Sequence, residues 1–203
     1  KPTTRNDLSY ASVCISYDDN HNRISEHYFD TSEKPTFSSF GYASLTRVYE
    51  GKQLIMEAYF GTDGEPVLIA QGYAALARTH NDSGKLESES YMGIDGKLHK
   101  CVNGYARIEY EYDENGNVTL QRYLDETERL TIAAVGYAEV RRQYEGSNLI
   151  LETYYGSDAK PLIQAAGYAA ISQEWNEGRL VSRTYLDAKG IPINRADGYS
   201  KAV

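Results

Sequence analysis

Pairs of an acidic residue and a tyrosine recur along the chain at a spacing that could bind a ligand. A glutamate stands two residues before a tyrosine in four places, and two further tyrosines hold the same repeat position. Residues two apart on a β-strand point to the same face. A carboxylate beside an aromatic ring could hold a quaternary ammonium by cation–π attraction, or accept hydrogen bonds from a stacked sugar. The candidate ligand contacts are Glu26, Tyr28, Glu57, Tyr59, Glu89, Tyr91, Tyr123, Glu152, Tyr154 and Tyr185.

A second interpretation of these pairs is purely structural. Repeats bury regular side chains simply to pack on one another, so the tyrosines could form an internal ladder. The glutamates would then pair with Arg47, Arg78 and Arg142. Exposure of the tyrosine rings distinguishes the two interpretations.

No residues with the spacing of a catalytic or metal centre are present. The four histidines fall at four different repeat positions, and the stretches "DENGN" and "TDGE" lack the spaced acids of a calcium loop. Cys14 and Cys101 have neither zinc nor disulfide spacing, and we expect both to be buried thiols. The sequence therefore predicts no enzyme, no metal site and no cofactor.

Composition narrows the class of partner. A net charge of -8 argues against nucleic acid, which requires clustered basic residues. No apolar run approaches the roughly 20 residues of a membrane span. The opening "KPTTRNDLSY" lacks a methionine and a signal-peptide pattern, which suggests a fragment of a longer protein.

The whole chain is built of repeats that begin at Gly-Tyr-Ala or a close variant. The expected units are 9–40, 41–71, 72–103, 104–135, 136–166 and 167–197, with a partial unit at 198–203, all in one repeat domain. Each unit keeps 7 residues between its first two aromatic positions and 14 between its last ring and the next Gly-Tyr, with His80 in place of an aromatic once. All length variation falls in polar stretches such as "EGKQ" and "DENGN". These stretches are therefore predicted hairpin tips, where insertions face water.

The segments on either side of each tip alternate as β-strands do. If Tyr144 lies opposite Leu149, then Val140 and Arg142 share a core face with Leu151 and Tyr155, while Glu152 and Tyr154 lie on the opposite face. A single hairpin is barely stable in water, so neighbouring units must pack together. The predicted fold is all-β, an elongated, solenoid-like array of stacked β-hairpins with a period of 31–32 residues.

The pattern "GYA…VY…AYFGTDG…GYA" resembles bacterial cell-wall-binding repeats, the choline-binding and glucan-binding modules, although this chain has longer units and keeps one tryptophan, Trp175. The stretch "EYDENGNVTLQRYLDETERL" also resembles the tyrosine-aspartate repeats of bacterial surface proteins. Either resemblance implies a bacterial envelope or secreted location.

Two functions follow as hypotheses. One is a non-catalytic module that binds an envelope polysaccharide or a choline-bearing polymer through many weak sites, serving a larger surface protein or envelope enzyme. The other is a protein-interaction scaffold or rigid spacer with no small ligand.

Overall fold

The computed structural model describes residues 9–194 and 201–202, and it contains β-strands and no helix within those residues. The chain divides into two compact units, Lys1–Val102 and Asn103–Val203, which are described separately. The first unit contains β1 (Ser12–Tyr17), β2 (Arg23–Phe29), β3 (Ser44–Glu50), β4 (Gln53–Phe60), β5 (Ala75–His80) and β6 (Leu86–Met92). The second contains β7 (Arg107–Tyr112), β8 (Val118–Leu124), β9 (Glu139–Glu145), β10 (Asn148–Tyr155), β11 (Ala170–Asn176), β12 (Arg179–Leu186) and β13 (Lys201–Ala202). The predicted all-β array of hairpins is confirmed; Gly198, the start of the partial repeat, lies outside the described residues.

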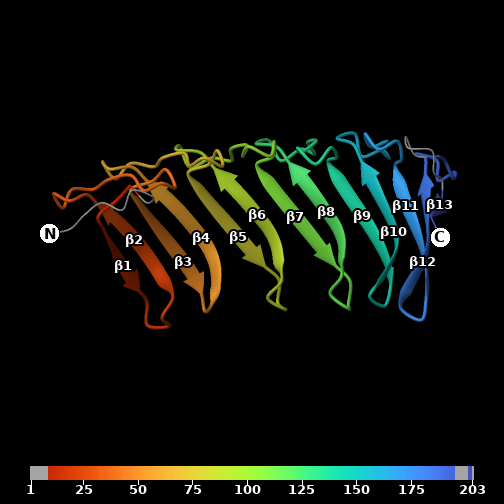
Figure 1. The fold of residues 1–203 in the computed structure, drawn as a ribbon, viewed down its shortest axis with the longest axis horizontal. Helices are drawn as coiled ribbons and strands as arrows, with labels where there is room; N and C mark the ends of the chain where they lie inside the picture. Colours follow the sequence, from red (N-terminus) through yellow and green to blue (C-terminus); the bar gives the residue numbers. More distant parts are fainter. Residues whose placement is uncertain (1–8, 195–200, 203) are drawn as a thin grey trace. The chain divides into compact units, whose positions relative to one another are not determined.

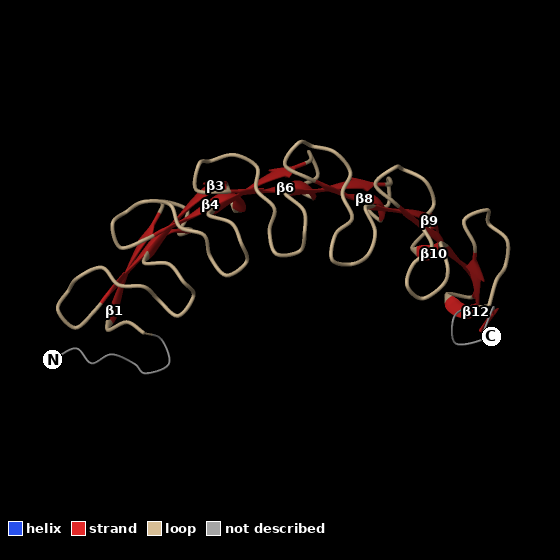
Figure 2. Cartoon of the chain, turned by 90° about the horizontal axis from the view of Figure 1, so that it is seen from above, coloured by secondary structure: helices blue, strands red, loops and turns tan. Residues whose placement is uncertain are grey.

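Within each unit, every strand pairs antiparallel with the next strand in the chain. Each hairpin is formed by two strands, as β3 and β4 are, and the hairpins are joined edge to edge, as β4 is to β5 through Glu57 and Leu76. The hairpin tips lie at one end of the strands and the connectors between hairpins at the other (Figure 1). Seen along the strands, loops extend to both sides of the sheet in each unit (Figure 2).

The hairpin tips come in two sizes, as their sequences predict. In the short form, Gly51 and Lys52 alone separate the paired residues Glu50 and Gln53. In the long form, the loop 113–117 is closed by a bond from Asp113 N to Asn117 O at 3.0 Å and one from Asn117 N to Asp113 Oδ1 at 2.8 Å. The variable repeat length is therefore accommodated at the tips.

The glycine of each Gly-Tyr-Ala motif has a backbone conformation that other residues avoid. Gly41 and Gly72 have φ of +88° and +87°, in the region open mainly to glycine. This conformation ends the connector in a tight turn, closed by a bond from Gly72 N to Ile69 O at 2.8 Å. It also lets Gly72 approach the next connector, since a Cβ at Gly72 would be 3.3 Å from Val102 N.

One sequence prediction, the division of the strands into faces, is wrong. Tyr144 does lie opposite Leu149, but a β-bulge follows and leaves Ile150 unpaired. Beyond the bulge Tyr154 pairs with Val140, so Glu152 and Tyr154 lie on the same face as Val140 and Arg142, and Leu151 and Tyr155 lie on the other. An extra residue in one strand reverses the faces of everything after it. All six described hairpins carry such a register shift near the tip.

The tyrosine face is the buried face of the sheet, and the connectors cover part of it. In the first unit Leu45 and Tyr59 pack with Ile69 from the connector. In the second, Ile108 and Tyr123 pack with Ala133 in the same way. The opposite face is more open, and Cys14 lies there opposite His27 and is exposed, contrary to expectation, whereas Cys101 is buried as predicted.

Candidate functional site

The tyrosines of each unit form one continuous ladder of ring contacts. Hairpin tyrosines alternate with Gly-Tyr tyrosines, so each Gly-Tyr ring bridges two hairpins. In the first unit, Tyr42 lies 5.8 Å from Tyr28 and 5.0 Å from Tyr59 between ring centroids, and Tyr73 lies 6.0 Å from Tyr59 and 4.7 Å from Tyr91. The second unit repeats the order, with contacts of 4.7 to 6.1 Å among Tyr105, Tyr123, Tyr137, Tyr154, Tyr168 and Tyr185. Aromatic pairs at these separations attract one another beyond the area they bury.

The hydroxyl of most hairpin tyrosines bonds to the residue two places before it. Tyr28 Oη donates to Glu26 Oε2 at 2.5 Å. The hydroxyls of Tyr59, Tyr91 and Tyr154 donate in the same way to Glu57, Glu89 and Glu152. The glutamate–tyrosine pairing predicted from the spacing is therefore present, and each bond uses a carboxylate oxygen that a ligand would need.

The same glutamates are also paired with arginines. Arg47 Nε pairs with Glu57, while Arg78 Nε and Arg142 Nε each lie 2.6 Å from a carboxylate oxygen of Glu89 and Glu152. These are the arginines that the structural interpretation of the pairs expects. Each carboxylate thus has a tyrosine donor and a cationic partner within the chain.

Burial removes most of the surface that a ligand would contact. Five of the six hairpin tyrosines, Tyr28, Tyr59, Tyr91, Tyr123 and Tyr185, are 4% to 8% exposed, and Tyr154 is partly buried. Glu26 and Glu57 are buried as well, and Glu89 and Glu152 are partly so. Ligand binding by these ten residues stays a prediction, and their burial does not favour it.

The buried phenols hold their protons firmly. Burial raises the pKa of Tyr28, Tyr59 and Tyr154 well above the usual range for a phenol, and the neighbouring carboxylates raise it further. Burial also raises the pKa of Tyr137 to about 12. These four phenols are therefore uncharged at ordinary pH, and their hydroxyls remain donors.

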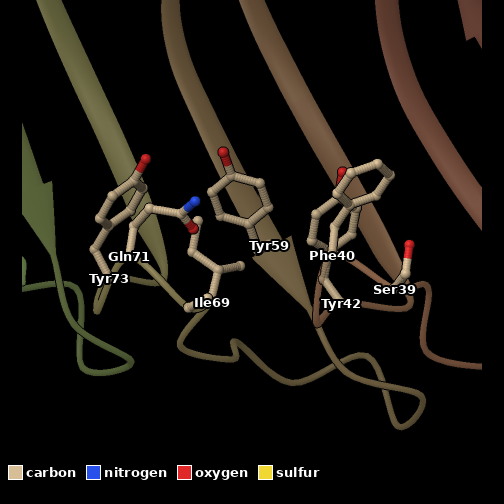
Figure 3. Close-up of a pocket in the computed structure, with 8 residues that line it drawn as sticks. Ser39, Phe40, Tyr42, Tyr59, Ile69, Gln71 and Tyr73 are labelled. Atoms are coloured by element: carbon tan, nitrogen blue, oxygen red, sulfur yellow. The ribbon is translucent and has the colours of Figure 1, made fainter.

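A shallow pocket opens at the connector end of the ladder in the first unit (Figure 3). Its volume is about 350 Å³, and it is lined by Ser39, Phe40, Tyr42, Tyr59, Ile69, Ala70, Gln71 and Tyr73. Figure 3 shows Phe40 and Tyr42 side by side on one side of Tyr59, with Gln71 and Tyr73 on the other. Sequence reasoning did not find Phe40 or Gln71, because their repeat position changes type from one copy to the next.

Most of the large apolar side chains that remain exposed lie on the connectors, although Val48, Met56, Leu180 and Val181 are exposed on strands. Phe37 and Leu68 hold the same position in consecutive repeats and are 43% and 44% exposed. In the second unit, Ile132 and Ile163 hold that position and are 48% and 55% exposed. Exposed apolar side chains that recur at one repeat position are candidates for a contact surface.

The described residues show no metal centre and no membrane-spanning helix. Nowhere in 9–194 and 201–202 do three or more His, Cys, Asp or Glu side chains come together as metal ligands. Over the same residues, no helix is long and apolar enough to cross a bilayer.

Comparison with known proteins identifies no family for the chain. No protein-family model and no curated protein matches it. One solved structure, described as TcdB2-TccC3-TEV, is similar at 12% sequence identity and a TM-score of 0.37. The alignment covers 94% of this chain but only 9% of that chain. A likeness at this level assigns neither a family nor a function.

Proposed function

We propose that the chain is a non-catalytic repeat scaffold that makes contacts with other proteins through its connectors. The observation that carries this proposal is that most hairpin tyrosines of the ladder are buried while apolar side chains on the connectors are exposed. The tyrosine ladder is internal and its polar groups are satisfied within the chain, whereas exposed apolar residues recur on the connectors. The sheet supplies rigidity, and the connectors supply the surface for contact.

Binding of a bacterial envelope polysaccharide or choline-bearing polymer is the second candidate. It is supported by the aromatic lining of the pocket beside Tyr59, because aromatic rings can stack on sugars or attract a quaternary ammonium. An envelope or secreted location belongs to this candidate and rests on the sequence resemblance alone.

Photo-crosslinking in the producing cell tests the scaffold. A photoreactive amino acid is placed at Phe40 or Ile132 on the connectors, and at Lys52 on an exposed hairpin tip as the matched control. We expect protein adducts from the two connector positions and few from the tip. Adducts to polysaccharide, equal yields from all three positions, or no adducts would contradict the proposal. Retention of the folded chain on a choline resin or glycan array would favour the second candidate.

A further inference from the structure

The pocket in the first unit is a cleft between the turns of two successive connectors, 38–41 and 69–72. Phe40 stacks on Tyr42 with centroids 6.2 Å apart and planes 22° from parallel, and it remains 58% exposed. Gln71 is exposed on the opposite wall, and within the described chain its side-chain amide makes no hydrogen bond. The cleft therefore combines an exposed aromatic face with an available amide.

In the described part of the chain, no backbone hydrogen bond joins the two connectors that form the cleft at this point. Gln71 O accepts a bond from Val102 N at 2.9 Å, which joins the next pair of connectors. In the second unit Asn103 O accepts from Ala134 N at 2.8 Å in the same way. Among the described residues no such bond links Phe40 to Ala70, and the space between them is lined by ring faces instead.

The lining favours one recurring mode of peptide recognition. Proline-rich segments bind aromatic-lined grooves, in which flat rings pack on the pyrrolidine and polar side chains bond to the peptide carbonyls. Phe40, Tyr42 and Tyr73 offer rings of this kind, and the Gln71 amide offers a donor. No lysine or arginine lines the cleft, so it offers no cation to a phosphate or carboxylate.

The distance between equivalent positions of successive repeats also favours a peptide in the polyproline II conformation. Each repeat adds two strands to the sheet, and neighbouring strands are about 4.8 Å apart, so equivalent connector positions such as Phe37 and Leu68 lie about 9.6 Å apart. Three residues of polyproline II span about 9.3 Å. Seven residues of an α-helix span about 10.5 Å, and two residues of a strand about 6.7 Å. A polyproline II segment therefore presents its side chains most nearly in step with the repeats.

Charge around the cleft indicates what flanks the proline-rich segment. The two connectors that form the cleft, 30–40 and 61–71, together contain four acidic residues, Asp30, Glu33, Asp63 and Glu65, and one basic residue, Lys34. Asp63 and Glu65 lie in an exposed turn, and the ring tip of Phe37 lies against that turn, since a Cβ at Gly61 would be 3.7 Å from Phe37 Cζ. Exposed acidic groups beside an apolar contact favour a cationic partner.

We propose that the cleft between Phe40 and Gln71 binds a proline-rich segment in the polyproline II conformation, with proline at every third position and arginine or lysine at its ends. The inference rests on the proposed scaffold function and names the class of partner and its place of contact.

Peptide titration of the ¹⁵N-labelled 203-residue chain tests it. The probe is a synthetic peptide with proline at every third position and arginine at both ends. The matched peptide has the same composition with its prolines moved out of the three-residue register. We expect saturable shifts of the Gln71 side-chain amide and the Gly72 backbone amide with the first peptide, and about tenfold weaker binding of the second.

Two variants establish the place of binding. Phe40→Ser should weaken binding about tenfold, whereas Val48→Ser, which changes an exposed apolar residue in the β3–β4 hairpin, should leave it unchanged. Equal binding of both peptides, shifts mapped elsewhere, or no shift at millimolar peptide would overturn the inference. Shifts at Gln71 caused by choline or an oligosaccharide and not by peptide would assign the cleft to the second candidate. If crosslinks from Phe40 still give protein adducts while the peptides fail, the scaffold stands and the proline-rich class is wrong.

Discussion

Arg47 on β3 donates from Nη1 to Glu26 Oε1 on β2 at 2.8 Å, so a partly buried ion pair joins one hairpin to the next. The Nε of the same guanidinium pairs with Glu57 across its own hairpin. One arginine therefore neutralises two carboxylates that are themselves bound to ladder tyrosines. The ladder is held together by polar contacts as well as by ring packing.

Replacing Arg47 tests how much this network contributes. Arg47→Met should lower the free energy of unfolding by about 3 kcal/mol, because Glu57 loses its cation and Glu26 keeps Arg23 alone, at 3.2 Å. Lys97→Met is the matched control, since Lys97 and Asp95 are exposed and their ends are 3.8 Å apart; it should cost less than about 1 kcal/mol. Urea unfolding followed by circular dichroism measures both, and equal losses would show that the Arg47 network does not stabilise the fold.

Insertion of one glycine should affect stability differently at a hairpin tip and in a connector. At the tip after Gly51 it should change stability by about 0.5 kcal/mol or less, because other hairpins already carry the longer tip. After Val67 it should cost about 2 kcal/mol or more, because it displaces Ile69 from its packing on Leu45 and Tyr59. Thermal unfolding compares the two, and a tip insertion as harmful as the connector insertion would contradict the division.

Alanine substitutions at two Gly-Tyr-Ala glycines can separate the cost of backbone strain from the cost of contact between the new Cβ and a neighbouring connector. Gly41 and Gly72 have nearly the same φ, so alanine at either should cost about 1–2 kcal/mol from the left-handed backbone. A Cβ at Gly41 meets nothing within 4 Å, whereas one at Gly72 would be 3.3 Å from Val102 N. We expect Gly72→Ala to cost about 1 kcal/mol more than Gly41→Ala. Equal costs in denaturant unfolding would mean that the connector moves aside freely.

The sequence predicts the array well because its spacings are properties of the repeat. The constant 7 and 14 residues and the variable tips correctly place the hairpins and the special glycines. The faces could not be predicted in the same way. Tyr144 and Leu149 do pair as expected, but the unpaired Ile150 reverses the faces beyond it, and no residue type marks the bulge.

The cleft was missed for a different reason. Phe40 and Gln71 occupy the same repeat position but share no chemistry, so a search for recurring residue types passes over both. The cleft is formed by two successive connectors that come together only in the folded chain, which is a tertiary feature. The ion pairs with Arg47, Arg78 and Arg142 were foreseen because arginine and glutamate recur at fixed distances from the ladder.

Alkaline pH should destabilise the folded chain because it favours ionisation of the ladder tyrosines. A tyrosine in an unfolded chain loses its proton near pH 10, whereas burial raises the pKa of Tyr28, Tyr59 and Tyr154 in the folded chain. Above about pH 10 the folded state therefore binds more protons than the unfolded state, and its stability falls as pH rises. Below that pH both states hold these protons, and the contribution is constant.

Urea unfolding at a series of pH values between neutral and strongly alkaline measures this loss, with tyrosinate absorbance as a second readout. We expect the free energy of unfolding to decline from about pH 10, and Tyr28, Tyr59 and Tyr154 to ionise only as the chain unfolds. Tyr59→Phe removes one such group and should make the decline shallower, although it lowers stability at neutral pH by leaving the Glu57 carboxylate without its donor. Tyr17→Phe, which removes a hydroxyl from a ring that is 59% exposed and leaves the ladder intact, is the matched control. If the tyrosines of the folded chain ionise near pH 10 without loss of structure, the ladder is open to solvent, and polymer binding through its rings becomes the better account.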